Sequence, residues 1–255
     1  MNVFSKPKKD ALSTKNQQNR PKTFHFGKTS ILRAVWFFIG LLALLILGLS
    51  FLAPIVKDAG KVDYFDYVSE LRSNVLTAEA KNYALRVYAL EKETPYAADG
   101  VRREMTRRAE VYFIAPSGDK TATVSFSVDS NDYGGEMSYD NVKEEYFFSV
   151  SADVSALRSL DVRIRYGNEE ISLTARTIKT ETTLSPREIL EKLKENEPTV
   201  FETLTNENGF VGEINLRLIS DDSPYYYVGL IEKSGKTRAY LLTSDTGRVL
   251  AKRES

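Results

Sequence analysis

Cysteine is absent from all 255 residues of the chain. This absence excludes disulfide bonds, thiolate catalysis, cysteine-ligated zinc and lipidation at an N-terminal cysteine. A domain that works outside the cell without disulfides must be stabilised by its own apolar core. About 190 residues are enough to bury a core of that kind.

Histidine is almost as scarce, because His25 is the single histidine and it precedes the long apolar run of the chain. The residues after that run therefore cannot form a Ser-His-Asp triad, a histidine-ligated zinc site or a histidine general base. A Ser–Lys dyad or a carboxylate pair is the remaining route to catalysis, and no spacing singles out either. A hydrolase that uses such groups is accordingly the third of three functional hypotheses.

Acidic and basic residues are equal in number, 35 of each, but they are unevenly placed. Eight basic residues and one acidic residue precede Ala34. Residues 1–33 have little apolar surface to bury, so they are expected to form a disordered cytoplasmic tail. Their charge suits either a topology signal, the favoured interpretation, or attraction to anionic lipid. Too few aromatic residues accompany the basic ones to indicate nucleic-acid binding.

Residues 34–56 form a hydrophobic run of 23 residues without a charge. As a helix this run would be roughly 34 Å long, enough to cross a hydrocarbon core of about 30 Å. Arg33 and Lys57 bracket it, and Trp36 stands where an interfacial aromatic residue belongs. The pattern predicts a single-pass protein in the lipid bilayer of the cell membrane, with its C-terminal domains extracytoplasmic. A cleaved signal peptide is the less favoured alternative, because its apolar region would be shorter.

Residues 57–82 are predicted to hold an amphipathic helix that leaves the membrane. The apolar residues Phe65, Val68, Leu71 and Val75 recur at steps of three and four. That spacing places them on one face of a helix.

Residues 83–183 change to a period of two, in segments rich in Val, Ile, Thr, Tyr and Phe. The expected strands cover residues 85–93, 105–115, 120–128, 144–154, 160–166 and 171–181. Turn signals separate several of them, at residues 116–118, 131–135 and 167–169. Short strands with turns between them predict an all-β domain, an antiparallel sandwich similar in pattern to immunoglobulin-like domains.

Residues 184–255 predict a small α+β domain. Ser185, Pro186 and Glu188 supply a cap hydroxyl, a proline in the first helical position and a carboxylate three residues after the cap. A helix is expected over residues 187–196. The expected strands cover residues 210–219, 225–233 and 237–243, followed by a short closing strand.

The segment YYYVGLIEKSGKTRAYLLTSDTGRVL, residues 225–250, is similar to the PepSY family. The resemblance rests on the preceding helix, a tyrosine-containing strand, a Gly-Lys hairpin and a closing strand with Thr-Gly and Val-Leu. One position departs from the family pattern, because Thr243 stands where an aspartate is usual. The resemblance implies a small α+β module that binds or inhibits other proteins rather than a catalyst.

Residues 129–140, DSNDYGGEMSYD, are the strongest candidate for a metal site. The hard oxygen ligands come from Asp129, Asn131, Asp132, Glu136 and Asp140. Ca²⁺ prefers six to eight such oxygens, but the flanking segments are expected strands rather than the helices of an EF-hand. A polar hairpin loop, in which Asn, Asp and Gly satisfy the backbone of a turn, is the favoured interpretation. Calcium is the alternative, and no other cofactor is indicated.

Tyr225, Tyr226 and Tyr227 are consecutive within an expected strand. Alternation sends Tyr225 and Tyr227 to one face of the sheet and Tyr226 to the other. The pair on one face is a candidate peptide-binding surface, although packing beneath a helix is the favoured interpretation for at least one face.

These features together predict a non-catalytic binding or regulatory module of the bacterial cell envelope, whose partner is another envelope protein or a peptide. A structural accessory subunit of a membrane complex, for example in cell-wall synthesis or division, is the second hypothesis. It differs in requiring a specific sequence in the membrane helix. The oligomeric state is not predicted.

Overall fold

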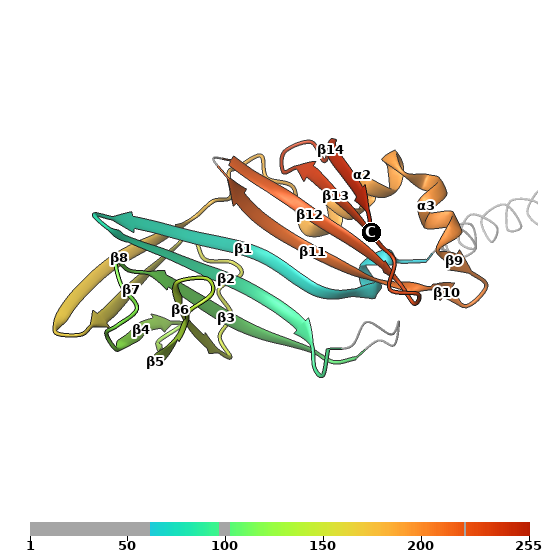
Figure 1. The fold of residues 1–255 in the computed structure, drawn as a ribbon. Coiled ribbons are helices and arrows are strands. Elements are labelled where there is room, and N and C mark those ends of the chain that lie inside the picture. The colour runs from blue at the N-terminus through green and yellow to red at the C-terminus, as the bar shows by residue number, and fades with distance from the viewer. Residues whose placement is uncertain (1–61, 97–102, 222) are drawn as a thin grey trace, which may run out of the picture. The chain divides into compact units, whose positions relative to one another are not determined.

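The computed structural model describes residues 62–96, 103–221 and 223–255, and these are dominated by a single twelve-stranded sheet (Figure 1). The strands follow one another across this sheet in the order β14-β13-β12-β11-β1-β2-β3-β6-β5-β4-β7-β8. Their bounds are β1 Val68–Ala80, β2 Tyr83–Glu93, β3 Met105–Ile114, β4 Ala122–Val128, β5 Asn131–Asp140, β6 Glu145–Val150, β7 Ser159–Tyr166, β8 Glu169–Thr177, β11 Gly212–Asp221, β12 Ser223–Glu232, β13 Thr237–Thr243 and β14 Val249–Glu254. The short strands β9 (Thr205–Asn206) and β10 (Gly209–Phe210) pair only with each other.

Eight of the strands, β1 to β8, close into a ring. The ring closes because β8 pairs with β1, at Leu76–Thr177 and Thr77–Arg176, and all of its neighbouring strands run antiparallel. Side chains of β4 and β7 alternate strictly between buried and exposed, as expected for strands with one face on a core. The buried faces form one apolar cluster that includes Leu76, Phe113 and Ile164.

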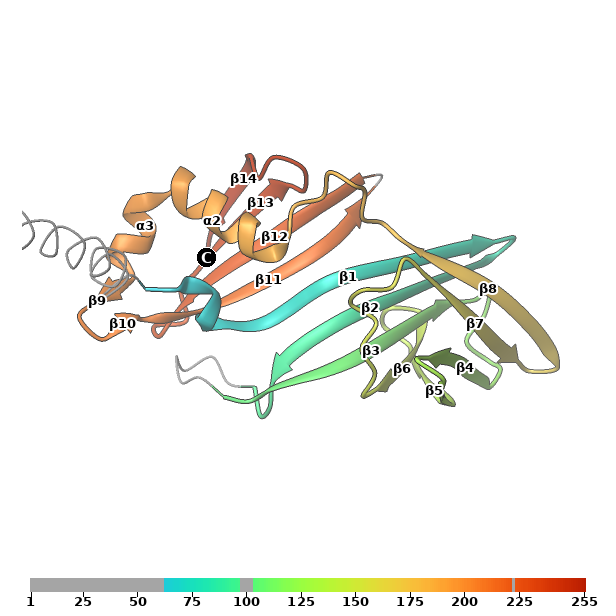
Figure 2. The ribbon, with the colours of Figure 1, turned by 180° about the vertical axis from the view of Figure 1, so that it is seen from behind.

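The other four long strands extend the sheet beyond β1, and two helices cover one of their faces (Figure 2). β11 pairs with β1 in parallel, and β12, β13 and β14 follow antiparallel. Helix α2 (Pro186–Asn196) buries Ile189 and Leu193, and helix α3 (Pro198–Thr203) buries Phe201, all against the same apolar cluster as Leu216 and Val228. This second cluster is distinct from the one inside the ring.

Strand β1 contributes residues to both apolar clusters. It occupies the segment for which an amphipathic helix was predicted, so that prediction is wrong. Residues Tyr64–Tyr67 form only a short 3-10 turn, and Val68–Ala80 is a strand. The register of β1 shifts between Val68 and Glu70 against β11, and between Arg72 and Asn74 against β2. A bulge adds a residue to the strand, so Val68 and Leu71 reach the same cluster although they are three residues apart, an odd step that plain alternation would not give. The step of four from Leu71 to Val75 is common to strands and helices. Together the two steps imitate a helix.

The predicted immunoglobulin-like sandwich followed by a separate α+β domain is wrong. The middle strands do not form two stacked sheets, because β1 and β5, neither of which was predicted as a strand, complete a closed ring. The C-terminal strands do not form a sheet of their own, because β11 hydrogen-bonds to β1 and continues the same sheet. The strands predicted over residues 85–93, 160–166 and 237–243 are nevertheless present, with bounds within two residues of those expected.

Strand β5 occupies the segment that was predicted to turn. The turn lies earlier, at Asp129 and Ser130, which have φ values of 49° and 65°. Two consecutive residues with positive φ are the requirement of a type I′ turn, one of the two favoured turns of a two-residue hairpin. Gly134 is needed within the strand for another reason, because a Cβ there would lie 2.6 Å from the carbonyl oxygen of Val124.

No helix within residues 62–96, 103–221 and 223–255 has the length and apolar character needed to cross a bilayer. The described residues therefore give no support to the single-pass topology and the membrane location predicted from the sequence. The run at residues 34–56, together with Arg33, Trp36 and Lys57, lies outside the described residues, as does His25.

Helix α2 begins as predicted. The Ser185 hydroxyl accepts a hydrogen bond from the backbone N–H of Glu188, and the Glu188 carboxylate accepts one from the backbone N–H of Ser185 at 2.7 Å. These bonds satisfy N–H groups that the first turn of a helix leaves unpaired. The capping box is therefore confirmed.

Tyr226 lies beneath this helix, and its loss is expected to change stability in a pH-dependent way. Its hydroxyl donates to the carbonyl oxygen of Leu184 at 3.0 Å, and burial raises the pKa of Tyr226. A raised folded-state pKa stabilises the fold fully below about pH 10, the unfolded value, and the contribution is lost as the pH rises further. Tyr226→Phe should therefore lower the free energy of unfolding by about 1 kcal/mol at pH 7 and by less at pH 10.5. Urea unfolding of the full chain at both pH values measures this difference.

The matched control is Tyr225→Phe, because Tyr225 is half-buried on the opposite face of β12. It should leave the free energy of unfolding unchanged within about 0.5 kcal/mol. If Tyr226→Phe lowered the free energy of unfolding by the same amount at both pH values, the result would contradict a raised pKa for the Tyr226 phenol.

Candidate binding cleft

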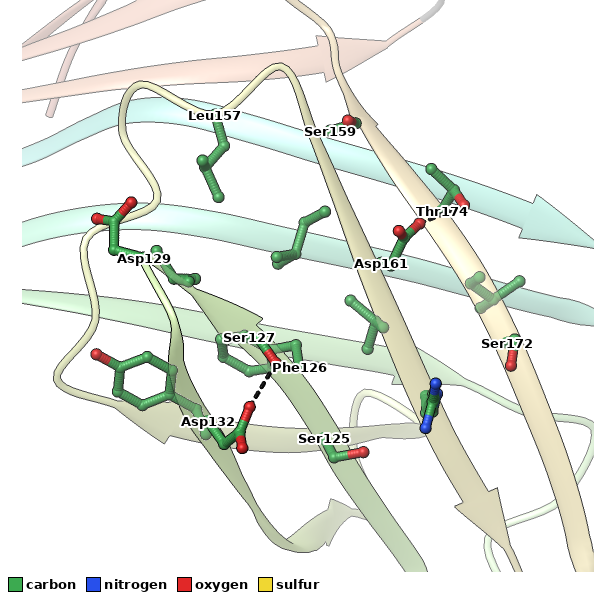
Figure 3. Close-up of a pocket in the computed structure, with 16 residues that line it drawn as sticks. Ser125, Phe126, Ser127, Asp129, Asp132, Leu157, Ser159, Asp161, Ser172 and Thr174 are labelled. Atoms are coloured by element: carbon green, nitrogen blue, oxygen red, sulfur yellow. Dashed lines mark hydrogen bonds between the residues drawn. The ribbon is translucent and has the colours of Figure 1, made fainter.

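A cleft opens in the ring where β4 and β7 separate (Figure 3). The two strands pair from Ala122–Tyr166 as far as Phe126–Val162, and no ladder pair joins them beyond that point in the described residues. The cleft there has a volume of about 890 Å³. It is lined by Ser125, Phe126, Ser127, Val128, Asp129, Asp132, Tyr133, Leu157, Ser159, Leu160, Asp161, Val162, Arg163, Ser172, Leu173 and Thr174.

Hydrogen bonds from a side chain of β1 fix the loop that precedes β7. The Asn74 amide nitrogen donates to the carbonyl oxygens of Val154 and Leu157, at 3.2 and 2.9 Å. Its oxygen accepts from the Thr177 hydroxyl at 2.6 Å. Asn74 is buried, so these bonds tie the loop before β7 to β1 and to the end of β8. Asn74 thus positions Leu157, which lines the cleft.

The floor of the cleft is apolar. It consists of the inward-facing side chains Phe126, Val128, Leu160 and Val162, which are also members of the ring's apolar cluster. The Phe126 ring stacks on Tyr133 with centroids 5.6 Å apart. A ligand that reaches this floor would therefore contact aliphatic and aromatic surface.

The rim is polar and mainly acidic. The Ser127 hydroxyl donates to Asp132 at 2.6 Å on one side, and the Thr174 hydroxyl donates to Asp161 at 2.6 Å on the other (Figure 3). Asp129 adds a third carboxylate, against the single positive charge of Arg163 among the lining residues. The rim can accept hydrogen bonds and attract cationic groups.

A shallower hollow of about 260 Å³ continues the cleft past the β4–β5 turn and shares Val128, Asp129 and Tyr133 with it. Arg107 and Asp153 lie across this hollow, with their charged groups 3.3 Å apart. Hydrogen bonds from Ser155 lower the pKa of the Asp153 carboxyl. Asp153 therefore stays ionised over the physiological range and pairs with the guanidinium.

The five residues of the predicted calcium loop are not brought together. Asp129 and Asp132 line the cleft, and Asn131 lines the adjoining hollow. Glu136 and Asp140 lie further along β5, where Asp140 accepts hydrogen bonds from the backbone N–H groups of the following turn, which lower its pKa. No group of three or more acidic, histidine or cysteine side chains suited to a metal occurs in the described part of the chain. Calcium binding stays a prediction without geometric support.

Tyr225 and Tyr227 lie away from the cleft. They are half-buried on the face of β12 opposite the buried Tyr226, so the predicted alternation is confirmed. The Arg217 guanidinium lies 5.7 Å from the Tyr227 ring centroid. A binding role for this pair stays a prediction.

Asp161, Arg163 and Thr174 were not singled out from the sequence. Their strands were expected, and alternation identifies them as outward-facing. The spacing carries no signal for which outward-facing residues border a cleft, because that depends on where β7 leaves β4.

Comparison with known proteins finds no family model, no curated protein and no solved structure that matches this chain.

Proposed function

We propose that this protein is a non-catalytic binding module that engages a protein or peptide partner through the cleft between β4 and β7. The observation that carries the proposal is the combination of an apolar floor with a hydrogen-bonding rim in a cleft of about 890 Å³. Ligand sites are mostly apolar concavities of roughly 300–1,000 Å³ with a few placed polar groups.

The groups at the rim suit binding better than catalysis. Ser127 is paired with a carboxylate, which is a much weaker base than the imidazole or amine that activates serine in enzymes. The described residues contain no histidine or cysteine. Carboxylates and hydroxyls held in fixed hydrogen bonds can instead recognise the amides and cationic side chains of a polypeptide.

A photo-crosslinking group in the cleft should trap this partner. Ser125 lines the cleft with an exposed side chain, so p-benzoylphenylalanine at this position should give a light-dependent polypeptide adduct of the full chain in the cells that produce it. A second change, Ser127→Trp, should reduce the adduct by about tenfold, because the bulky indole would stand on the rim and obstruct the entry of the partner into the cleft. Mass spectrometry of the adduct identifies the crosslinked polypeptide.

The same crosslinker at Glu136 is the matched control, because this residue is exposed on β5 but does not line the cleft. It should give no adduct. An absence of adduct at Ser125, or equal adducts at Ser125 and Glu136, would count against the cleft as the binding site.

A further inference from the structure

We infer that the cleft takes its partner as an added β-strand, a short extended segment in which apolar residues alternate with basic ones. This inference rests on the proposed function and specifies the chemistry of the partner and its mode of binding. Its first support is the pairing of the two strands that border the cleft.

Where β4 and β7 no longer pair with each other, each strand still pairs with its other neighbour, β4 with β5 and β7 with β8. The β4–β5 pairing continues through Ser127–Asp132 and Val128–Asn131. The β7–β8 pairing includes Leu160–Ala175 and Asp161–Thr174. The register of β4 with β7 would place Ser127 opposite Asp161 and Val128 opposite Leu160, but the pairing stops one residue earlier, at Phe126–Val162.

Two regular strand edges therefore face each other across the cleft. Backbone N–H and C=O groups along a strand edge are strong hydrogen-bonding groups that require a partner. A peptide strand can supply that partner along an exposed edge. The separated portion covers two residues of β4, Ser127 and Val128, and three residues of β7, 159–161, or roughly 7–10 Å at 3.3 Å per residue. A short segment is sufficient to fill it.

The apolar floor and the acidic rim of the cleft determine which side chains such a strand would carry. Successive residues of a strand point to opposite faces. Residues that point inward would meet Phe126, Val128 and Leu160 on the floor, so apolar side chains fit there.

Residues that point outward would lie between Asp132 on one side and Asp161 on the other, with Asp129 at the end of β4 (Figure 3). Each carboxylate that already accepts a hydroxyl retains lone pairs for another donor. Lysine or arginine is therefore the complementary outward residue, and acidic residues would be repelled.

The test uses three synthetic peptides with the full chain: acetyl-Val-Lys-Val-Lys-Val-amide, its counterpart with Glu in place of Lys, and the lysine peptide N-methylated on its three central backbone nitrogens. Each carries the same fluorophore, and anisotropy at low ionic strength gives Kd. The lysine peptide should bind at least about tenfold more tightly than the glutamate peptide, because of the acidic rim. N-methylation should weaken binding by about tenfold or more, because it removes the donors of the strand ladder.

The double variant Asp132→Asn, Asp161→Asn should reduce the preference for lysine over glutamate to about twofold, because the charges that select lysine are gone. Glu136→Gln removes a carboxylate from β5 outside the cleft and should leave the preference unchanged. All three substitutions retain the size of the side chain and leave one oxygen that can accept a hydrogen bond. Circular dichroism should therefore show an unchanged fold.

Failure of this inference is distinguishable from failure of the proposed function. Equal binding of the methylated and unmethylated peptides would overturn strand addition, as would binding of no peptide while the adduct at Ser125 persists, and in both cases the cleft would still be a binding site. A preference for lysine that survives the double Asn variant would overturn the role of the rim. Loss of both peptide binding and the Ser125 adduct would overturn the inference and the proposed function together.

Discussion

Replacing Glu70 by alanine is expected to lower the free energy of unfolding by about 2–3 kcal/mol. Removing one partner of a buried ion pair costs roughly 3–5 kcal/mol, and the lower figure applies here because about a third of the Arg217 side chain is exposed. The Glu70 carboxylate itself is 7% exposed and accepts two hydrogen bonds from the Arg217 guanidinium, at 2.6 and 2.8 Å. Lys92 approaches it to 3.6 Å.

The position of Glu70 explains why this loss should affect the whole fold. Glu70 is on β1, Lys92 is on β2 within the ring, and Arg217 is on β11 in the strands that extend the sheet. β1 and β11 form the parallel pairing that joins the two apolar clusters. Without the carboxylate, Arg217 would remain partly buried without its anionic partner, next to Lys92.

Chemical denaturation of the full chain measures the effect, and Glu79→Ala is the matched control because Glu79 is exposed near the end of the same strand. The control should change the free energy of unfolding by less than about 0.5 kcal/mol. A double-mutant cycle with Arg217→Ala isolates the interaction, and a coupling energy near zero would refute the ion pair as the cause.

Replacing Phe113 by alanine is expected to lower the free energy of unfolding by about 3–5 kcal/mol, more than any of the other substitutions. Phe113 is completely buried inside the ring. Its ring stacks on Tyr83 with centroids 5.6 Å apart, and the rings of Tyr146 and Tyr166 each lie 6.1 Å away. Strands β2, β3, β6 and β7 all contribute to this aromatic group, so the substitution would leave a cavity bordered by all four.

The neighbouring residue supplies the control for this prediction. Ile114 follows Phe113 on β3 but points outward and is 36% exposed. Ile114→Ala should cost about 1 kcal/mol or less, whereas Phe113→Leu should recover much of the loss. Thermal unfolding should show a fall of roughly 10 °C for Phe113→Ala. Similar effects for the two alanine substitutions would contradict the assignment of the core face.

Local patterns predicted those parts of the fold whose interactions are local. The capping box at Ser185 needs only groups within three residues of one another, and alternation in residues 160–166 reports directly which side chains are buried. The alternation of Tyr225, Tyr226 and Tyr227 follows from strand geometry for the same reason. These predictions required no knowledge of the neighbouring strands.

Two strands of the twelve-stranded sheet, β1 and β5, were not predicted, because their sequences resemble those of other structures. The bulge of β1 after Val68 places Leu71 three residues further on, and with the step of four to Val75 the spacing matches that of a helix. The glycines of β5 resemble those of a turn, but they allow close approach of the neighbouring strands. Both misreadings removed a strand from the expected sheet, so closure of the ring could not be foreseen.

The content of residue types was sufficient to exclude disulfides and cysteine chemistry, and the local periods were sufficient to indicate a β-rich chain with helices near residue 190. Long-range pairing decided the rest: that β8 returns to β1, that β11 continues the same sheet, and that β4 and β7 separate after Phe126 and Val162. The reason is that ladder hydrogen bonds join backbone groups that every residue carries, so the partner of a strand is selected by burial summed over the whole sheet. The cleft lies where β4 and β7 no longer pair, which depends on the pairing of the whole sheet. Its residues could therefore be identified only in the folded chain.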